Sequence, residues 1–90
     1  MEFYKYTHIA TAVATTVYAK NCFLHSITLN EDLTDTVTIA DGDNTIAIIT
    51  AGTNLVMPIT LPYDVECVSN LVITTAGADD ITVSWKPLTI

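Results

Sequence analysis

Apolar and polar residues alternate along this chain in short runs with a period of two, which is typical of β-strands. No window of about eleven residues repeats apolar side chains at the spacing of an amphipathic helix. Clusters of Gly, Asn and Asp separate the runs, as turn residues do between strands. The predicted strands cover residues 3–9, 12–19, 23–30, 36–40, 45–50, 55–61, 63–68, 71–75 and 81–86.

These runs predict an all-β fold, a small antiparallel β-sandwich of jelly-roll-like type with about eight short strands and no significant helix. Two sheets packed face to face would bury the alternating apolar side chains. We expect one domain over residues 1–90, with residues 1–10 as an N-terminal arm or an edge strand. The N-terminal run should pair with a sheet edge of its own molecule or lie against a neighbouring subunit, because open edges invite pairing.

The run at 55–61 has the cleanest alternation, but Pro58 and Pro62 lie in or beside it. Proline cannot donate to a strand ladder, so this run is expected at an edge or as a short, irregular strand. In the run at 23–30, His25 is placed on the same side as Ile27 and Leu29, which predicts a hydrogen-bonded core or interface histidine. The predicted core is Ile27, Leu29, Val37, Ile39, Ile48, Met57, Ile59, Ile73, Ile81, Val83 and Trp85.

The composition supports a folded core with an unusually neutral exterior. Hydrophobic residues make up 50% of the 90 residues and charged residues only 14%, so part of the surface should consist of uncharged Thr, Ala and Val. The net charge is −7, with only Lys5, Lys20 and Lys86 positive. Three scattered lysines cannot track phosphates, so we expect no nucleic-acid partner and no anionic membrane surface.

The two cysteines, Cys22 and Cys67, are expected to be reduced thiols. The N-terminal residues lack a basic region followed by a long apolar run, so synthesis in a cytosol without a secretory signal is expected. Cys67 is in step with Tyr63 and Val65, which predicts a buried thiol that behaves as a small hydrophobe.

Candidate chemistry is weak at every position considered. His25 and Ser26 are neighbours on a strand and point to opposite faces, and no Gly-x-Ser-x-Gly motif exists, so no catalytic residue is assigned. The Asp- and Asn-rich segment 41–44 has clustered oxygens, but it lacks the spacing of a calcium loop and suits a turn. We therefore expect no metal and no cofactor.

The aromatic residues leave two interpretations open. Trp85 shares its face with Ile81 and Val83, which favours core packing over a sugar-binding platform. Tyr4 and Tyr6 share a face near the N-terminus and could anchor an interface, because tyrosine is enriched there. The candidate interface residues are Phe3, Tyr4 and Tyr6.

The segments at 15–17, 24–30, 36–41 and 70–85 resemble small β-sandwich virion structural proteins of tailed bacteriophages, of the capsid decoration, head-surface or fibre-knob type. The resemblance implies a non-enzymatic protein of the virion, made in the host cytoplasm, that decorates or stabilises the outer capsid surface as a homo-oligomer. Its partner would be the major capsid protein or another virion protein. The acidity favours the outside of the capsid, because a −7 chain would be repelled by packaged DNA. A glycan- or receptor-binding module on a phage fibre or tail is the alternative.

Overall fold

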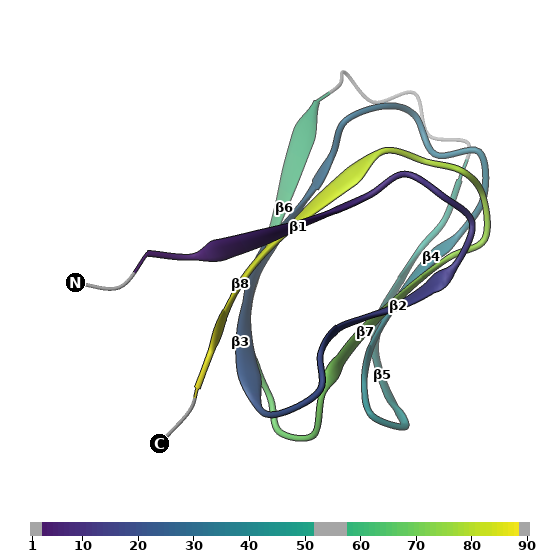
Figure 1. Ribbon diagram of the computed structural model, residues 1–90. Helices are drawn as coiled ribbons and strands as arrows, with labels where there is room; N and C mark the ends of the chain where they lie inside the picture. The colour runs from purple at the N-terminus through teal and green to yellow at the C-terminus, as the bar shows by residue number, and fades with distance from the viewer. Residues whose placement is uncertain (1–2, 52–57, 89–90) are drawn as a thin grey trace.

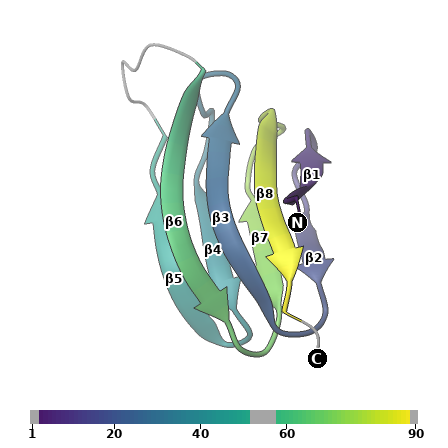
Figure 2. The ribbon, with the colours of Figure 1, turned by 90° about the vertical axis from the view of Figure 1, so that its left-hand side faces the viewer.

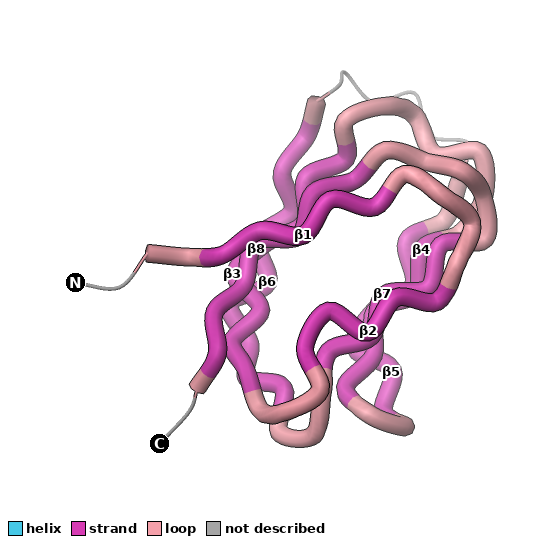
Figure 3. The backbone as a smooth tube through the Cα atoms, viewed as in Figure 1, coloured by secondary structure: helices cyan, strands magenta, loops and turns pink. Residues whose placement is uncertain are grey.

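The computed structural model describes residues 3–51 and 58–88, which form two four-stranded antiparallel sheets packed face to face (Figures 1 and 2). The first sheet contains, in spatial order, β1 (Lys5–Ile9), β8 (Ile81–Pro87), β3 (Cys22–Leu29) and β6 (Ile59–Cys67). The second sheet contains β2 (Ala14–Tyr18), β7 (Leu71–Thr75), β4 (Val37–Asp41) and β5 (Asn44–Ile49). Figure 3 shows only strands and loops in the described residues, so the predicted all-β sandwich is confirmed.

The strand order is that of a jelly roll, with eight strands divided between two sheets. Among the described residues, only β4 and β5 are both consecutive in the chain and paired; every other ladder there joins strands that are distant in sequence. β8 pairs with both β1 and β3, and β7 pairs with both β2 and β4. The last two strands of the chain therefore occupy inner positions, β8 in the first sheet and β7 in the second.

The core lies between the sheets and contains most of the residues predicted for it. Ile27, Leu29, Val37, Ile39, Ile73, Ile81, Val83 and Trp85 are all buried. Ile59 is half-buried, and Met57 lies outside the described residues. The placement of Ile48 was wrong: its side chain is 60% exposed. Within β5, Ile46 is an extra residue relative to β4, so Ala47 and Ile49 pack against the core instead.

The two runs predicted at 55–61 and 63–68 form one strand, β6, from Ile59 to Cys67. β6 is at the edge of the first sheet, as Pro58 and Pro62 predicted. The cysteines Cys22 and Cys67 lie directly opposite each other on β3 and β6, both fully buried and both free thiols. Burial, together with the adjacent Cys22, raises the pKa of the Cys67 thiol to about 12.

A buried carboxylate holds two loops together at one end of the sandwich. Asp79, between β7 and β8, is fully buried and accepts hydrogen bonds from the Thr34 amide at 2.9 Å and the Thr34 hydroxyl at 3.0 Å. The Asp35 amide approaches its second oxygen at 3.4 Å. Gly77 completes the contact, since a Cβ there would collide with the Thr34 hydroxyl. The β3–β4 connection is thereby fixed against the β7–β8 connection.

A second carboxylate joins the two sheets at the other end of the sandwich. Asp41, at the end of β4, accepts hydrogen bonds from the amides of Ser69 and Val68 at 2.9 Å each. These hydrogen bonds hold the pKa of Asp41 below its usual range. Gly42 follows with a φ of 59°, which suits glycine, and its amide donates to Asn70 at 2.8 Å. The acidic segment considered for calcium thus ties the β4–β5 turn to the β6–β7 loop.

None of the residues that the structure describes forms a helix with the length and apolar character needed to cross a bilayer.

Candidate functional site

The N-terminal candidate residues lie along the free edge of the first sheet. β1 pairs with β8, with Lys5 opposite Trp85, so this segment is an edge strand of its own sheet. The approach to β1 projects from the sandwich (Figure 1). Phe3 is 80% exposed, Tyr4 46% and Tyr6 77%. The three residues predicted for an interface are therefore available at the surface of the chain.

Two adjacent bulges shape the middle of the outer face of this sheet. In the ladder between β3 and β8, Leu24 pairs with Trp85 and Ser26 pairs with Ser84. His25 lies between them without a partner on β8, so it is the bulge residue. Across the same stretch β6 has one more residue than β3, and its Asp64 has a φ of 52°. Positive φ at a residue other than glycine is strained, and such strain concentrates at functional sites.

The bulges correct the predicted placement of His25. Leu24 on one side of the bulge and Ile27 on the other are both fully buried, so the inside–outside alternation shifts by one residue at His25. His25 therefore lies half-exposed on the outer face, away from the core side of Ile27. Its Nδ1 donates to Asp64 Oδ1 at 2.7 Å, so the two bulge residues hold each other in place.

An aromatic cluster forms around His25. The Tyr4 ring stacks on the imidazole with centroids 4.2 Å apart and planes 6° from parallel. The Phe23 ring lies 6.2 Å from Tyr4, and the Lys86 ammonium lies 5.7 Å from the Tyr4 centroid and 6.0 Å from that of Phe23. These separations suit aromatic and cation–π contacts. We call Tyr4, Phe23, His25, Asp64 and Lys86 the aromatic patch.

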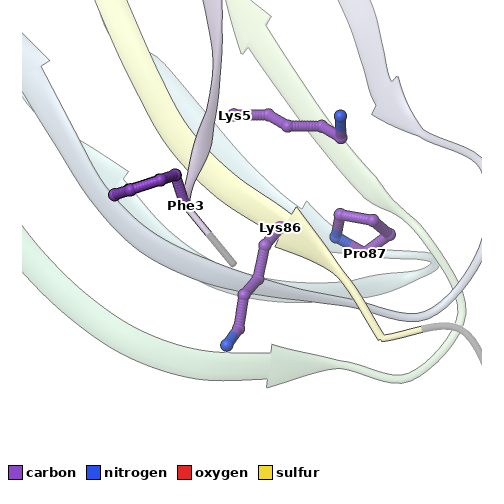
Figure 4. A pocket seen from close by; sticks show the side chains of 4 residues that line it. All are labelled: Phe3, Lys5, Lys86 and Pro87. Atoms are coloured by element: carbon purple, nitrogen blue, oxygen red, sulfur yellow. The ribbon is translucent and has the colours of Figure 1, made fainter. Parts of the chain in front are cut away.

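A shallow depression of about 190 Å³ adjoins the aromatic patch and is lined by Phe3, Lys5, Lys86 and Pro87. It contains two of the three lysines of the chain. In Figure 4 the ammonium groups of Lys5 and Lys86 point in different directions, so they do not converge on one anion. The depression extends the surface of the patch and does not form an enclosed ligand pocket.

The surroundings of His25 offer no nucleophile within the described part of the chain. Its only hydrogen-bond partner there is Asp64, while Ser26 is buried and Cys22 faces the core. Across residues 3–51 and 58–88, no three His, Cys, Asp or Glu side chains gather in a way that could hold a metal ion. The patch presents partly exposed aromatic rings, one cation and one carboxylate.

The other polar and aromatic candidates lie elsewhere. His8 donates to Asp80 at 2.7 Å at the far end of the same outer face. Trp85 points into the core beside Tyr18, with ring centroids 5.0 Å apart, and its indole donates to Thr7 at 3.0 Å. A sugar-binding surface would also need amide or carboxylate groups beside the aromatic rings, but Asn44 begins β5 in the second sheet, and Asn54 lies outside the described residues.

The second sheet presents an uncharged outer face, as the composition predicted. Of the residues in its four strands only Asp41 is charged, and its carboxylate is occupied by the backbone of the β6–β7 loop. The cross-strand register places Ala14, Thr74, Thr38 and Ile48 in one row of this neutral face.

Comparison with known proteins gave no match: no family model matches the chain, and neither a curated protein nor a solved structure does.

Proposed function

We propose that this protein is a non-enzymatic virion structural protein of a tailed bacteriophage, which decorates the outer capsid surface and docks through the aromatic patch. The observation that carries the proposal is the patch itself. Rings of Tyr4, Phe23 and His25 are gathered on a rigid sheet and left at the surface. Aromatic side chains are enriched at the centres of protein interfaces.

The stacking gives the patch the order that an anchor needs. Tyr4 is fixed against the imidazole of His25, which is itself held by Asp64 at 2.7 Å. Little side-chain freedom remains to be lost on docking, so more of the contact energy contributes to affinity. The strain at Asp64 supports the same view, because a φ of 52° costs stability and serves to aim these side chains.

Fold and charge are compatible with this role. Jelly rolls form viral capsid and lectin domains, although a fold alone does not fix a function. A chain of net charge −7 at high copy number is repelled by packaged DNA, which favours the outer surface of the particle. The aromatic patch contains Lys86, so the docking surface has a positive group in an otherwise acidic molecule.

Purified particles test the proposal directly. Mass spectrometry of intact virions should detect the chain at high copy number, and its absence from them would refute the virion assignment. Recombinant protein added to particles that lack it should bind, and Tyr4→Ala should weaken binding by about tenfold or more, as loss of an anchor does. Val68→Ala is the matched control, since Val68 is 65% exposed and outside the patch. Equal binding by both variants would exclude the patch as the anchor.

A glycan- or receptor-binding module is the second candidate, favoured by the exposed rings of Phe3 and Tyr6 beside the patch. Sugars stack on such rings and hydrogen-bond to neighbouring carboxylates, here that of Asp64. A glycan array with the intact protein should then give specific signals that Tyr6→Ala reduces. If the array showed no binding and capsids captured the protein, the glycan-binding candidate would be refuted and the decoration role supported.

A further inference from the structure

The strand β5 has a free edge. Within the part of the chain that the structure describes, β5 pairs only with β4, and it ends the second sheet (Figure 2). An edge strand presents unpaired amides and carbonyls that can accept another strand. Natural sheets guard such edges with charges, prolines or bulges, so the residues of each edge indicate whether pairing is permitted.

Both edges of the first sheet are guarded. β1 carries Lys5 among only five residues. β6 contains Pro62, which has no amide hydrogen, and the bulge at Asp64, and it also carries the charge of Glu66. A second chain would meet charges, a missing donor or an irregular backbone at either of these edges.

The edges of the second sheet differ from these and from each other. β2 has no charge, but its register shifts between Thr16 and Tyr18. β5 has neither charge nor proline and contains three isoleucines, the residue type that favours strands. Its own bulge is at Ile46, which leaves Ala47–Ile49 as regular strand. Ile48 in that stretch is 60% exposed on the neutral face.

The charge distribution selects the kind of partner. Two copies of a −7 chain repel each other wherever their acidic surfaces approach. The β5 edge and the adjoining neutral face carry no charge apart from the occupied Asp41, so a second copy can approach there without facing like charges. A basic partner would instead be drawn to the acidic loops.

We propose that two copies of this chain pair antiparallel through their β5 edges, which joins their second sheets into one continuous sheet. Such pairing is two-fold symmetric and self-complementary. With the axis at Ile48, in the middle of the regular stretch, the two copies of Asp43 lie roughly 34 Å apart, which exceeds the screening length of about 8 Å. Parallel pairing would bring them within about 5 Å of each other.

Antiparallel edge pairing keeps each face of the sheet on its own side. Both aromatic patches of the dimer then point in the same direction, on the side opposite the joined neutral faces. The inference does not depend on the proposed function, although a dimer with two patches would bind a repeating surface with avidity.

Sedimentation equilibrium of the full chain tests the dimer. An edge contact is smaller than the roughly 800 Å² per partner of a standard interface, so dissociation in the micromolar range is expected. Added salt should strengthen it by screening the −7 charges. Ile48→Glu should weaken dimerisation by about tenfold or more, because it places a charge beside the pairing edge. A wild-type chain that stays monomeric at high micromolar concentration would overturn the proposal.

Thr74→Glu is the matched control, because Thr74 is exposed on the same neutral face but belongs to the inner strand β7. It should leave the dimer intact. Loss of the dimer with Thr74→Glu and its persistence with Ile48→Glu would indicate stacking of faces and refute edge pairing. If Ile48→Glu does not fold, hydrogen exchange of the wild type decides: amides of Asn44–Ile49 should exchange more slowly as concentration rises. Exchange independent of concentration would also refute the proposal.

Discussion

Replacing the buried Asp79 by alanine should destabilise the protein strongly. The carboxylate accepts hydrogen bonds from the Thr34 amide at 2.9 Å and its hydroxyl at 3.0 Å, and a longer one from the Asp35 amide at 3.4 Å. Two backbone hydrogen bonds also join the β3–β4 and β7–β8 connections, from the Asn30 amide to the Asp80 carbonyl and from the Ala76 amide to the Thr36 carbonyl, each at 3.0 Å. Asp79→Ala removes the acceptor for all three donors and leaves a small void in the place of a fully buried side chain.

The size of the effect follows from these contacts. A hydrogen bond to a charged group contributes about 1.5–3 kcal/mol, so the two short ones contribute about 3–6 kcal/mol at most. Because Thr34 is exposed, water will replace part of the lost hydrogen bonding, so we expect the free energy of unfolding to fall by about 3 kcal/mol. Asp79→Asn retains one carbonyl oxygen for the two Thr34 donors and should cost about 1 kcal/mol.

Thermal and urea unfolding followed by circular dichroism measure the difference. A loss of about 3 kcal/mol lowers the melting temperature by roughly 12–24 °C in a domain of this size. Asp43→Ala, in the exposed β4–β5 turn, is the control and should stay within about 0.5 kcal/mol of the wild type. If Asp79→Ala were as stable as Asp43→Ala, the hydrogen bonds of Asp79 would contribute nothing to stability, and the argument would be wrong.

Three further predictions follow from the core, one carboxylate and the thiols. Ile81→Ala should cost about 2–5 kcal/mol in urea unfolding, whereas Ile48→Ala, at a site 60% exposed, should cost less than about 1 kcal/mol; equal losses would contradict the assigned faces. The folded pKa of Asp41 is depressed, so its contribution to stability is present above the unfolded pKa of about 3.9 and is lost as pH falls through the lower folded pKa. The difference in unfolding free energy between the wild type and Asp41→Asn should therefore narrow on acidification. Cys22 and Cys67 should resist a thiol reagent at neutral pH until denaturant is added, and rapid labelling of the native protein would refute their burial.

The fold class could be predicted from the sequence because alternation and turn residues act locally. The prolines at 58 and 62 correctly indicated an edge, since the missing donor of proline restricts where any strand can place it. What the sequence could not supply was the pairing of strands, because contacts such as Lys5 with Trp85 join residues from opposite ends of the chain. The division of β6 into two runs failed for a related reason: Pro62 interrupts the pattern but not the strand.

The candidate site was found only in part, and bulges are the reason. Phe3, Tyr4 and Tyr6 were proposed as interface residues because bulky aromatics stand out in a terminal run; all three are exposed, and Tyr4 belongs to the aromatic patch. His25 was assigned to the core side because the period of two was carried through the bulge, which shifts the alternation by one residue. Leu24 and Ile27 are both buried although they are three residues apart, and a regular strand would place them on opposite faces. These two large apolar residues were the one indication of a bulge in the sequence. In β5, the four consecutive residues Ile46–Ile49 are all apolar, so alternation could not assign Ile48 to a face.

The inner position of β7 and β8 determines when this protein can fold during its synthesis. A ribosome that has released only the first 70 residues has produced β1 and β2 without any partner strand, since both pair only with strands made later. The emerging chain can form the β4–β5 hairpin and join β3 to β6, but neither complete sheet. The second sheet therefore closes only after Thr75 has left the exit tunnel, and the first only after Pro87 has, in slow steps dominated by distant contacts. A premature stop before β7 yields an aggregation-prone chain of open edges instead of a smaller domain.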